Sequence, residues 1–196
     1  MSKRLVLLCV LLVPTLALSA CGGGSGSGDE SKIEEAIEAS ATAATPAACT
    51  EFQTQKFTEQ TTQESGKAAV EQCEEEAEKE EGASSVKVSN VSVSGSDATA
   101  EAALSGGGGL DGQTVEVSLV KEGDQWKLDE AVKFTKFDQG KLVEGFEREI
   151  EKSGEVSSKF ATCLIGALKQ IDQTETEELF FHSSGQGFEE IAKECS

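Results

Sequence analysis

The cysteine thiols are the side chains of this sequence whose positions best indicate a chemistry. Six cysteines occur among 196 residues, at positions 9, 21, 49, 73, 163 and 195. A cysteine that ends an export signal can be acylated, whereas cysteines elsewhere in an exported chain usually pair as disulfides. No two cysteines have the Cys-x-x-Cys spacing of a zinc site, and His182 is the only histidine. We therefore expect no metal site, and nothing in the sequence indicates a cofactor.

Residues 1–20 have the organisation of a secretory signal peptide. Lys3 and Arg4 form a positive start, an apolar run follows from Leu5 to Ala17, and small residues then precede Cys21. The apolar run is too short for a membrane-spanning helix and lacks the flanks of one. The sequence therefore predicts that the chain is exported.

The four residues Leu18-Ser19-Ala20-Cys21 match the lipobox of bacterial lipoproteins, an aliphatic residue and two small residues before a cysteine. This resemblance implies that the Cys21 thiol receives a diacylglyceryl thioether and becomes the first residue after cleavage. Two acyl chains suffice for stable anchoring, whereas one binds only marginally. We expect a lipid-anchored protein on the extracytoplasmic face of the cell membrane. In the alternative, an ordinary signal peptidase cleaves after Ala20 and Cys21 is incidental.

The net charge of the chain excludes some classes of binding partner. Acidic residues outnumber basic ones by 36 to 17, which gives a net charge of −19. Loss of Lys3 and Arg4 with the leader makes the remaining chain more negative still. Such a charge disfavours nucleic acid as a partner and repels an anionic bilayer surface. Membrane contact is therefore expected through the lipid on Cys21 rather than through a basic patch.

The residues after Cys21 divide into a tether, residues 21–30, and a folded domain, residues 31–137. The tether is rich in glycine and serine, a composition typical of flexible linkers. Ser31 and Glu34 form a capping-box pattern that predicts the start of a first helix, which Pro46 ends.

Two further helices are predicted from about Ala47 to Glu59 and from about Glu64 to Glu80. Cys49 and Cys73 lie on the apolar sides of these helices, so antiparallel packing would bring the two thiols together. The glutamates of the third helix spread around it. They are therefore interpreted as a solvated face rather than as a cation site.

Beyond Gly82 the apolar residues alternate, as they do in β-strands. Val86 and Val88 are out of phase with Val91 and Val93, which predicts a β-bulge near Ser89-Asn90. Short turns separate this strand from three more, the last of which reaches about Phe134. The pattern predicts an α+β fold in which three N-terminal helices pack on a bent four-stranded antiparallel sheet.

Residues 138–196 are predicted to form a helical C-terminal segment stapled by a disulfide. Asp138 is expected to cap the first of its helices, and Thr174 with Glu177 forms a capping-box pattern for a later one. Cys163 and Cys195 both lie on apolar stripes, so they can meet where two helices pack.

Four cysteines allow three disulfide connectivities. We predict Cys49 with Cys73 and Cys163 with Cys195, because each pair is local in sequence and lies within one packing unit. These two disulfides would close loops of about 25 and 33 residues. In the loop-entropy treatment, each closure stabilises the fold by roughly 3.5 kcal/mol. The crossed pairings remain compatible with the composition, but they would require residues 138–196 to dock tightly over the second and third helices.

Three features resemble the nuclear transport factor two-like (SnoaL-like) cone, as in small exported lipoproteins of actinobacteria. They are the element order over about residues 31–134, the Cys49 and Cys73 pair, and the string from Val117 to Leu128 with its Gly-Asp-Gln-Trp-Lys turn. Enzymes with this fold, such as ketosteroid isomerases and SnoaL-like cyclases, use an Asp, His or Tyr inside the cone.

This sequence lacks, at its predicted inward positions, the catalytic residue types that those enzymes place inside the cone. It has no tyrosine and no histidine before His182, and Asp97, Asp111 and Asp124 fall in predicted turns. The histidine is expected to pack or to cap a helix end rather than to act as a base. We therefore expect no catalytic residue among these side chains.

Two functions remain. The preferred one is a non-catalytic envelope lipoprotein that binds a small apolar ligand or another envelope protein. The alternative is a cone-pocket enzyme of the isomerase or cyclase type, with a carboxylate base that the sequence does not identify. The interior of the cone distinguishes them, since an enzyme needs a buried ionisable group, whereas a binding module can be lined by apolar side chains.

Overall fold

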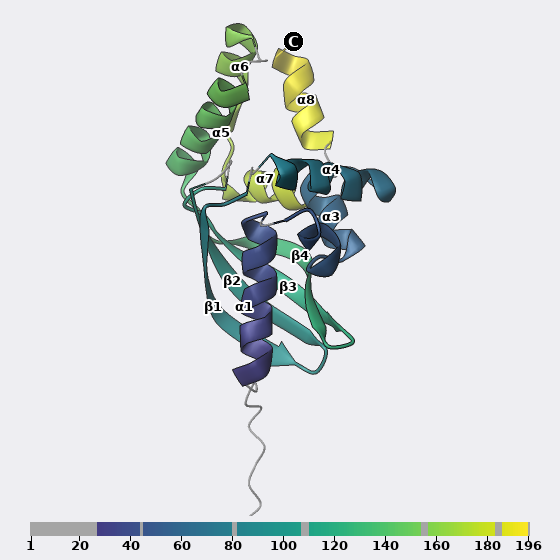
Figure 1. Cartoon of the computed structure of the whole chain (residues 1–196). Coiled ribbons are helices and arrows are strands. Elements are labelled where there is room, and N and C mark those ends of the chain that lie inside the picture. The colour runs from purple at the N-terminus through teal and green to yellow at the C-terminus, as the bar shows by residue number, and fades with distance from the viewer. Residues whose placement is uncertain are drawn as a thin grey trace, which may run out of the picture.

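The computed structural model describes residues 27–43, 45–79, 82–106, 110–153, 157–182 and 186–195. Cys21, the predicted signal peptide and most of the predicted tether lie outside these ranges. Within them, no helix combines the length and apolar character needed to cross a membrane. The described residues form an α+β fold, as the sequence predicts, with helices before and after one antiparallel sheet (Figure 1).

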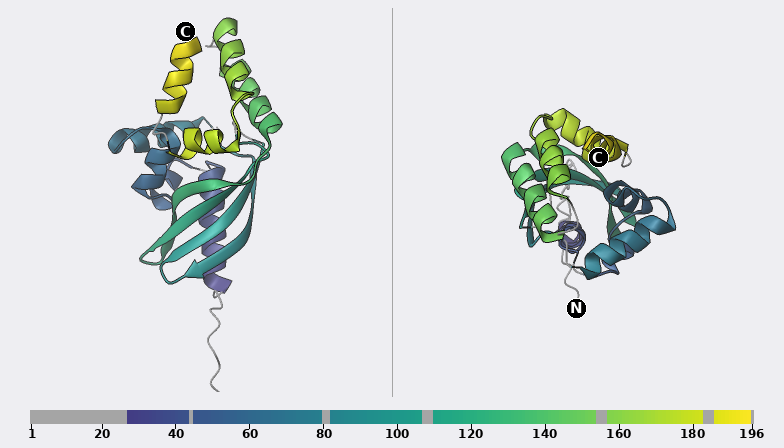
Figure 2. Two further views of the ribbon diagram at one scale, coloured as in Figure 1. Left: turned by 180° about the vertical axis from the view of Figure 1, so that it is seen from behind. Right: turned by 90° about the horizontal axis from the view of Figure 1, so that it is seen from above.

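The chain forms three successive blocks, first helices, then strands, then helices again (Figures 1 and 2). The first block is α1 (Ser27–Ala41), α2 (Ala48–Glu51), α3 (Gln55–Thr62) and α4 (Lys67–Glu78). The sheet contains β1 (Ser85–Ser94), β2 (Asp97–Ser105), β3 (Thr114–Glu122) and β4 (Gln125–Lys136). The C-terminal block is α5 (Gln139–Ser153), α6 (Ser158–Leu168), α7 (Gln173–Glu177), the π-helix η1 (Glu178–His182) and α8 (Gln186–Cys195).

The sheet is an antiparallel meander in the order β1-β2-β3-β4. The pairing of β1 with β2 shifts between Ser89 and Ser92, and Asn90 has a φ of 54°. The predicted β-bulge is therefore confirmed. It returns Val91 and Val93 to the face that carries Val86 and Val88, which all pack against the core.

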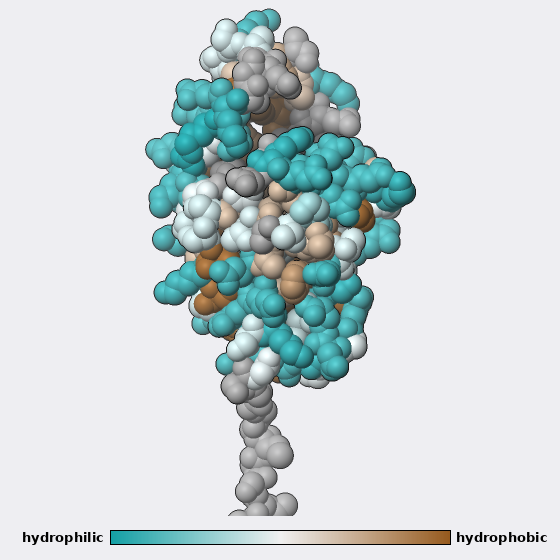
Figure 3. All heavy atoms as spheres, viewed as in Figure 1, coloured by the Kyte–Doolittle hydropathy of each residue, from teal (hydrophilic) through white to brown (hydrophobic). Residues whose placement is uncertain are grey.

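The sheet curves around α1 (Figure 1). Helix α1 contacts both β1 and β4, the two edge strands, and one helix can reach both edges only if the sheet bends around it. Ile33, Ala36 and Ile37 of this helix are at most 1% exposed. The facing side chains of β2 are Ala98, Ala100 and Ala102, whose small volume lets the helix lie within the bend. Figure 3 shows apolar residues reaching the surface beside α1 on an otherwise hydrophilic face.

Helix α1 begins at Ser27, so the predicted start at Ser31 is wrong and Ser31 lies inside the helix. Asp29, in the first turn, accepts hydrogen bonds from Lys121 Nζ at 2.7 Å and from Trp126 Nε1 at 2.9 Å. These contacts with β3 and β4 order a turn that its glycine and serine content would not favour. The carboxylate also suits the positive end of the helix dipole.

The predicted second helix is divided into α2 and α3, so four helices rather than three precede the sheet among the described residues. Phe52 O accepts from Leu128 N, and Thr54 N donates to Leu128 O, each at 2.8 Å. The chain is thus extended here, and Gln53 bridges to the edge of β4. Thr54 then caps α3 through its side chain. Pairing with an edge strand has overridden the helical pattern.

In the C-terminal block, Asp138 caps α5 as predicted, with Lys141 N donating to its carboxylate at 3.1 Å. The capping box of α7 is formed by Asp172 and Glu175, so the prediction of Thr174 and Glu177 is wrong. Glu177 instead accepts a hydrogen bond from Phe134 N at 2.8 Å. It is therefore used to join α7 to the end of β4.

Both predicted disulfides are present. Cys49–Cys73 joins α2 to α4, and Cys163–Cys195 joins α6 to α8. Each closes a local loop, with sequence separations of 24 and 32 residues. The crossed pairings are therefore not those of this structure, although the C-terminal block does dock on the sheet domain through η1.

We predict that Asp29 stabilises the fold in a pH-dependent way. Its hydrogen bonds from Lys121 and Trp126 hold the pKa of the carboxyl below its ordinary value of 3.8. A lowered pKa contributes stability that is present above the unfolded pKa and is lost as the pH falls through the folded pKa. Asp29→Asn should therefore lower the urea midpoint at about pH 7, and the difference from the parent should shrink below about pH 4.

Glu30→Gln provides the matched control, because Glu30 is an exposed neighbour in the same helical turn. Its effect on the urea midpoint should be small at both pH values. A loss in Asp29→Asn that is the same at about pH 3 and about pH 7 would contradict the assignment.

Candidate functional site

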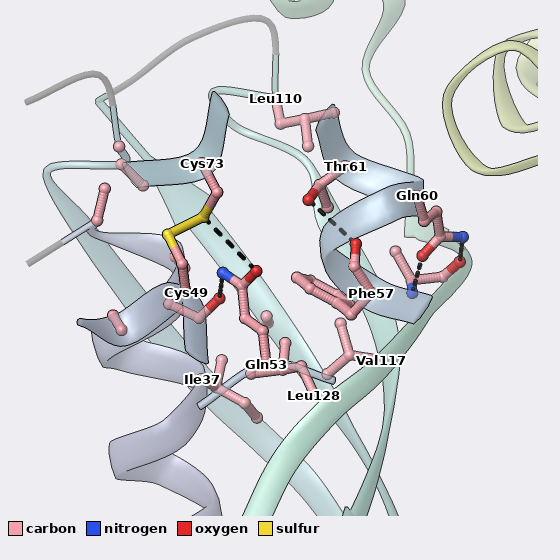
Figure 4. Close-up of a pocket in the computed structure, with 18 of the residues that line it drawn as sticks. Ile37, Cys49, Gln53, Phe57, Gln60, Thr61, Cys73, Leu110, Val117 and Leu128 are labelled. Atoms are coloured by element: carbon pink, nitrogen blue, oxygen red, sulfur yellow. Dashed lines mark hydrogen bonds between the residues drawn. A yellow bond between two sulfur atoms is a disulfide. The ribbon is translucent and has the colours of Figure 1, made fainter. Parts of the chain in front are cut away.

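A cavity of about 380 Å³ lies between the sheet and the helices that cover one end of it (Figure 4). Its volume falls within the range of small-molecule sites, roughly 300–1,000 Å³. The second half of α1 forms one side, α2, α3 and α4 form others, and the inner face of the sheet forms the floor. The labelled apolar side chains around it are Ile37, Phe57, Leu110, Val117 and Leu128.

The floor of the cavity follows from strand alternation. Side chains two residues apart point to the same face of a strand, so β2 contributes Ala102 and Leu104 and β3 contributes Val115 and Val117. The small side chain of Ala102 creates depth where a larger residue would fill the space. The inward alanines of β2 thus accommodate α1 at one end and leave room at the other.

The Cys49–Cys73 disulfide is part of the cavity wall, where it holds α2 against α4 (Figure 4). Gln53 lies beside it and is 7% exposed. Gln53 Nε2 donates to Ser40 Oγ at 2.7 Å, and Gln53 Oε1 accepts from Thr58 Oγ1 at 3.0 Å. Cys73 Sγ lies 3.7 Å from the same oxygen. This contact is not a hydrogen bond, because a disulfide sulfur has no hydrogen to donate. The amide therefore links α1 to α3 within the wall of the cavity.

Gln60 closes the cavity at the edge of β4. Its Oε1 accepts from Ala131 N at 2.8 Å, and its Nε2 donates to Ala131 O and to Phe181 O, each at 2.9 Å. The side-chain amide thus pairs with an edge strand as a neighbouring strand would. The same amide holds η1, which belongs to the C-terminal block.

The C-terminal block supplies the remaining wall through Phe180 and Phe181. Phe181 packs on Phe134 of β4 with ring centroids 4.9 Å apart, and Phe180 packs on Phe146 of α5 at 5.8 Å. Phe180 contacts both the core of the sheet domain and the core of the C-terminal helices. The cavity is therefore built jointly by the two parts of the chain.

Glu76 is the only ionisable side chain among the described residues that line the cavity. It lies on α4 and is half-buried. Its Oε1 accepts a hydrogen bond from Gln72 Nε2 at 2.8 Å. A carboxylate in this position can pair with a cation or accept a proton, so the enzymatic alternative would have to use it as the base that the sequence did not identify.

The polar residues singled out from the sequence lie elsewhere. Asp97 and Asp124 are exposed at the β1–β2 and β3–β4 turns, and Asp111 forms an ion pair with Arg148 at 2.7 Å. His182 is exposed at the end of η1. None of these four lines the cavity. The described residues also contain no group of three or more potential metal ligands.

The sequence did not identify Gln53, Gln60 or Glu76 as site residues. The two glutamines lie in stretches of polar residues, and Glu76 stands within a run of glutamates. The position of Gln53 between Phe52 and Phe57, within a short apolar pattern, could have indicated that its side chain is buried. Glu76 has no such signal, because only the packing of α4 on α2 and α3 places it at the cavity.

Comparisons with known protein families, with characterised proteins and with solved structures find no match to this chain.

We predict that Gln60 holds the C-terminal block on the sheet domain. Gln60→Leu keeps most of the side-chain volume but leaves three partly buried backbone groups of Ala131 and Phe181 without this partner. An unsatisfied buried group costs about 1–3 kcal/mol, so the free energy of unfolding should fall by at least that amount. Urea denaturation measures this loss, and limited proteolysis should show faster cleavage between residues 138 and 182.

Gln55→Leu is the matched control, since Gln55 is exposed on the same helix and its side chain bonds only Glu59 among the described residues. Equal stability losses in the two variants would show that Gln60 has no special role in docking.

Proposed function

We propose that this protein is a lipid-anchored lipoprotein of the cell envelope whose cavity binds a small apolar molecule without transforming it. The observation that carries the proposal is the cavity of about 380 Å³, which is lined mainly by apolar side chains from both parts of the chain. Concave, mostly apolar sites with a few polar groups are typical of small-molecule binding.

The anchoring part of the proposal rests on the sequence. The leader of residues 1–20 is followed by Cys21 in a lipobox, and the acidic chain would not adhere to an anionic bilayer by itself. Two acyl chains on Cys21 would supply the attachment.

The direction of α1 supports an arrangement in which the cavity is turned away from the bilayer. The start of α1 lies beside the β3–β4 turn, where Lys32 Nζ donates to Asp124 O at 3.0 Å, and the cavity begins at Ile37. Ten residues of helix separate Ser27 from Ile37 by roughly 15 Å. The cavity would thus lie toward the end of α1 that is farther in sequence from the predicted anchor, where ligands or envelope proteins could reach it.

We also propose that residues 31–137 are a divergent member of the nuclear transport factor two-like (SnoaL-like) cone superfamily, with residues 138–196 added to it. Support comes from the curved antiparallel sheet, the helix within its bend and the cavity at one end. Members of that superfamily with binding rather than catalytic roles would be the appropriate comparison.

We predict that Cys21 is the site of acylation. Cys21→Ser removes the thiol and should abolish incorporation of labelled fatty acid and shift the protein from the membrane fraction to the soluble fraction. Mass spectrometry of the parent protein should find a diacylglyceryl group on residue 21. Lipid label retained in the Cys21→Ser protein, or an unmodified N-terminus in the parent, would contradict the anchor.

We predict that filling the cavity blocks ligand binding. Ala41 is half-buried at the end of α1 and lines the cavity, so Ala41→Phe should place a ring in the binding space. Binding of a neutral, environment-sensitive apolar dye should weaken by roughly tenfold or more, the equivalent of about 1.4 kcal/mol. Fluorescence titration measures this change.

Ala68→Phe is the matched control, because Ala68 is exposed on α4 and does not line the cavity. Thermal unfolding of both variants would show that they remain folded. If the parent binds no apolar probe, or if folded Ala41→Phe binds as tightly as the parent, the cavity is not the binding site.

A further inference from the structure

We infer that the cavity discriminates ligands by charge, and that Glu76 is the residue that makes it prefer a cationic amphiphile over an anionic one. The inference rests on the proposed function and names the ligand class for the same cavity. It has two independent supports, the set of polar groups in the wall and the position of the one carboxylate.

An anionic group would find no cationic partner in the wall. The described lining residues include neither lysine nor arginine, and the whole chain has a net charge of −19. An unpaired ionised carboxylate is costly to bury in an apolar site. Nearby negative charge adds repulsion to this cost.

Both side-chain amides of the wall take part in hydrogen bonds within the fold. Gln53 Nε2 donates to Ser40, and Gln60 Nε2 donates to two backbone carbonyls. Gln60 uses both of its N–H donors in this way, so it would have to give up a bond that holds β4 or η1 in order to bind a ligand carboxylate. Gln53 uses one of its two donors on Ser40. Since an unmade buried hydrogen bond is costly, Gln60 favours ligands that do not require it as a donor.

Glu76 is placed to receive a cation. Gln72, one helical turn earlier, donates to Glu76 Oε1 at 2.8 Å, and among the described residues no hydrogen bond to the other carboxylate oxygen is found. The half-buried Glu76 lies next in sequence to Ala77, which also lines the cavity and is 6% exposed. A ligand whose apolar part fills the cavity can therefore bring an ammonium group to this carboxylate, a charge-assisted hydrogen bond.

The size of the cavity sets the length of suitable probes. At about 30 Å³ for each small group, the space holds roughly a dozen non-hydrogen atoms. Decylamine, decanol and decanoate have this size and share a straight chain of ten carbon atoms. Near neutral pH the amine is protonated and the carboxylic acid is ionised, so the three differ in head-group charge.

The test is displacement of a neutral apolar dye from the full mature protein by each probe at about pH 7.5, below the concentrations at which the probes aggregate. Decylamine should bind roughly tenfold more tightly than decanol, and decanoate roughly tenfold more weakly. Glu76→Gln should lower the affinity for decylamine to that for decanol and leave decanol within about twofold. Glu75→Gln, one residue earlier and exposed, should preserve the preference for the amine.

The inference is overturned if decanoate binds as tightly as decanol. It is also overturned if the preference for decylamine survives Glu76→Gln, or is lost equally in Glu75→Gln. Those results would leave the proposed function intact, since alkyl chains would still bind. Failure of all three probes and of the dye to bind would overturn both proposals.

Discussion

The bend of the sheet around α1 is the constraint on which the rest of the structure depends. One helix contacts both edge strands, and this is sterically feasible because β2 presents alanines to it while Ile33 and Ile37 fill the remaining space. The bulge at Asn90 keeps the valines of β1 on the inner face despite the bend. Because α1 occupies only part of the concave face, the other part becomes the cavity.

Side-chain amides of glutamine form hydrogen bonds with backbone groups that the curved sheet leaves without a partner strand. Gln60 pairs with the edge of β4 and holds η1, and Gln53 joins α1 to α3. Gln113, which is fully buried, pairs with both backbone groups of Asp138 at the start of α5. A glutamine amide can donate and accept at once, so it satisfies backbone groups where no further strand is present. These bonds make the sheet domain and the C-terminal block a single packed structure that shares the cavity.

Local sequence patterns were sufficient to predict the class of fold, the order of the strands in the meander and the pairing of both disulfides. Alternation of apolar residues defines the strands, and the phase change at Ser89-Asn90 defines the bulge, because each depends on neighbours a few residues apart. The disulfides followed from pairing within each block. Local patterns were insufficient at Phe52–Thr54, where pairing with Leu128, some 75 residues away, interrupts a helical pattern.

The sequence by itself determined the match of Leu18–Cys21 to a lipobox pattern, the acidic character of the chain and the α+β architecture, since these depend on residue type and short-range spacing. Only the tertiary structure decided where α1 begins, because Asp29 is fixed by Lys121 and Trp126 rather than by its neighbours. Only the tertiary structure also selected Glu76 from a run of similar glutamates, since that choice depends on which helix face packs at the cavity. Which residue lines the cavity is therefore a property of long-range packing, which residue type and spacing do not encode locally.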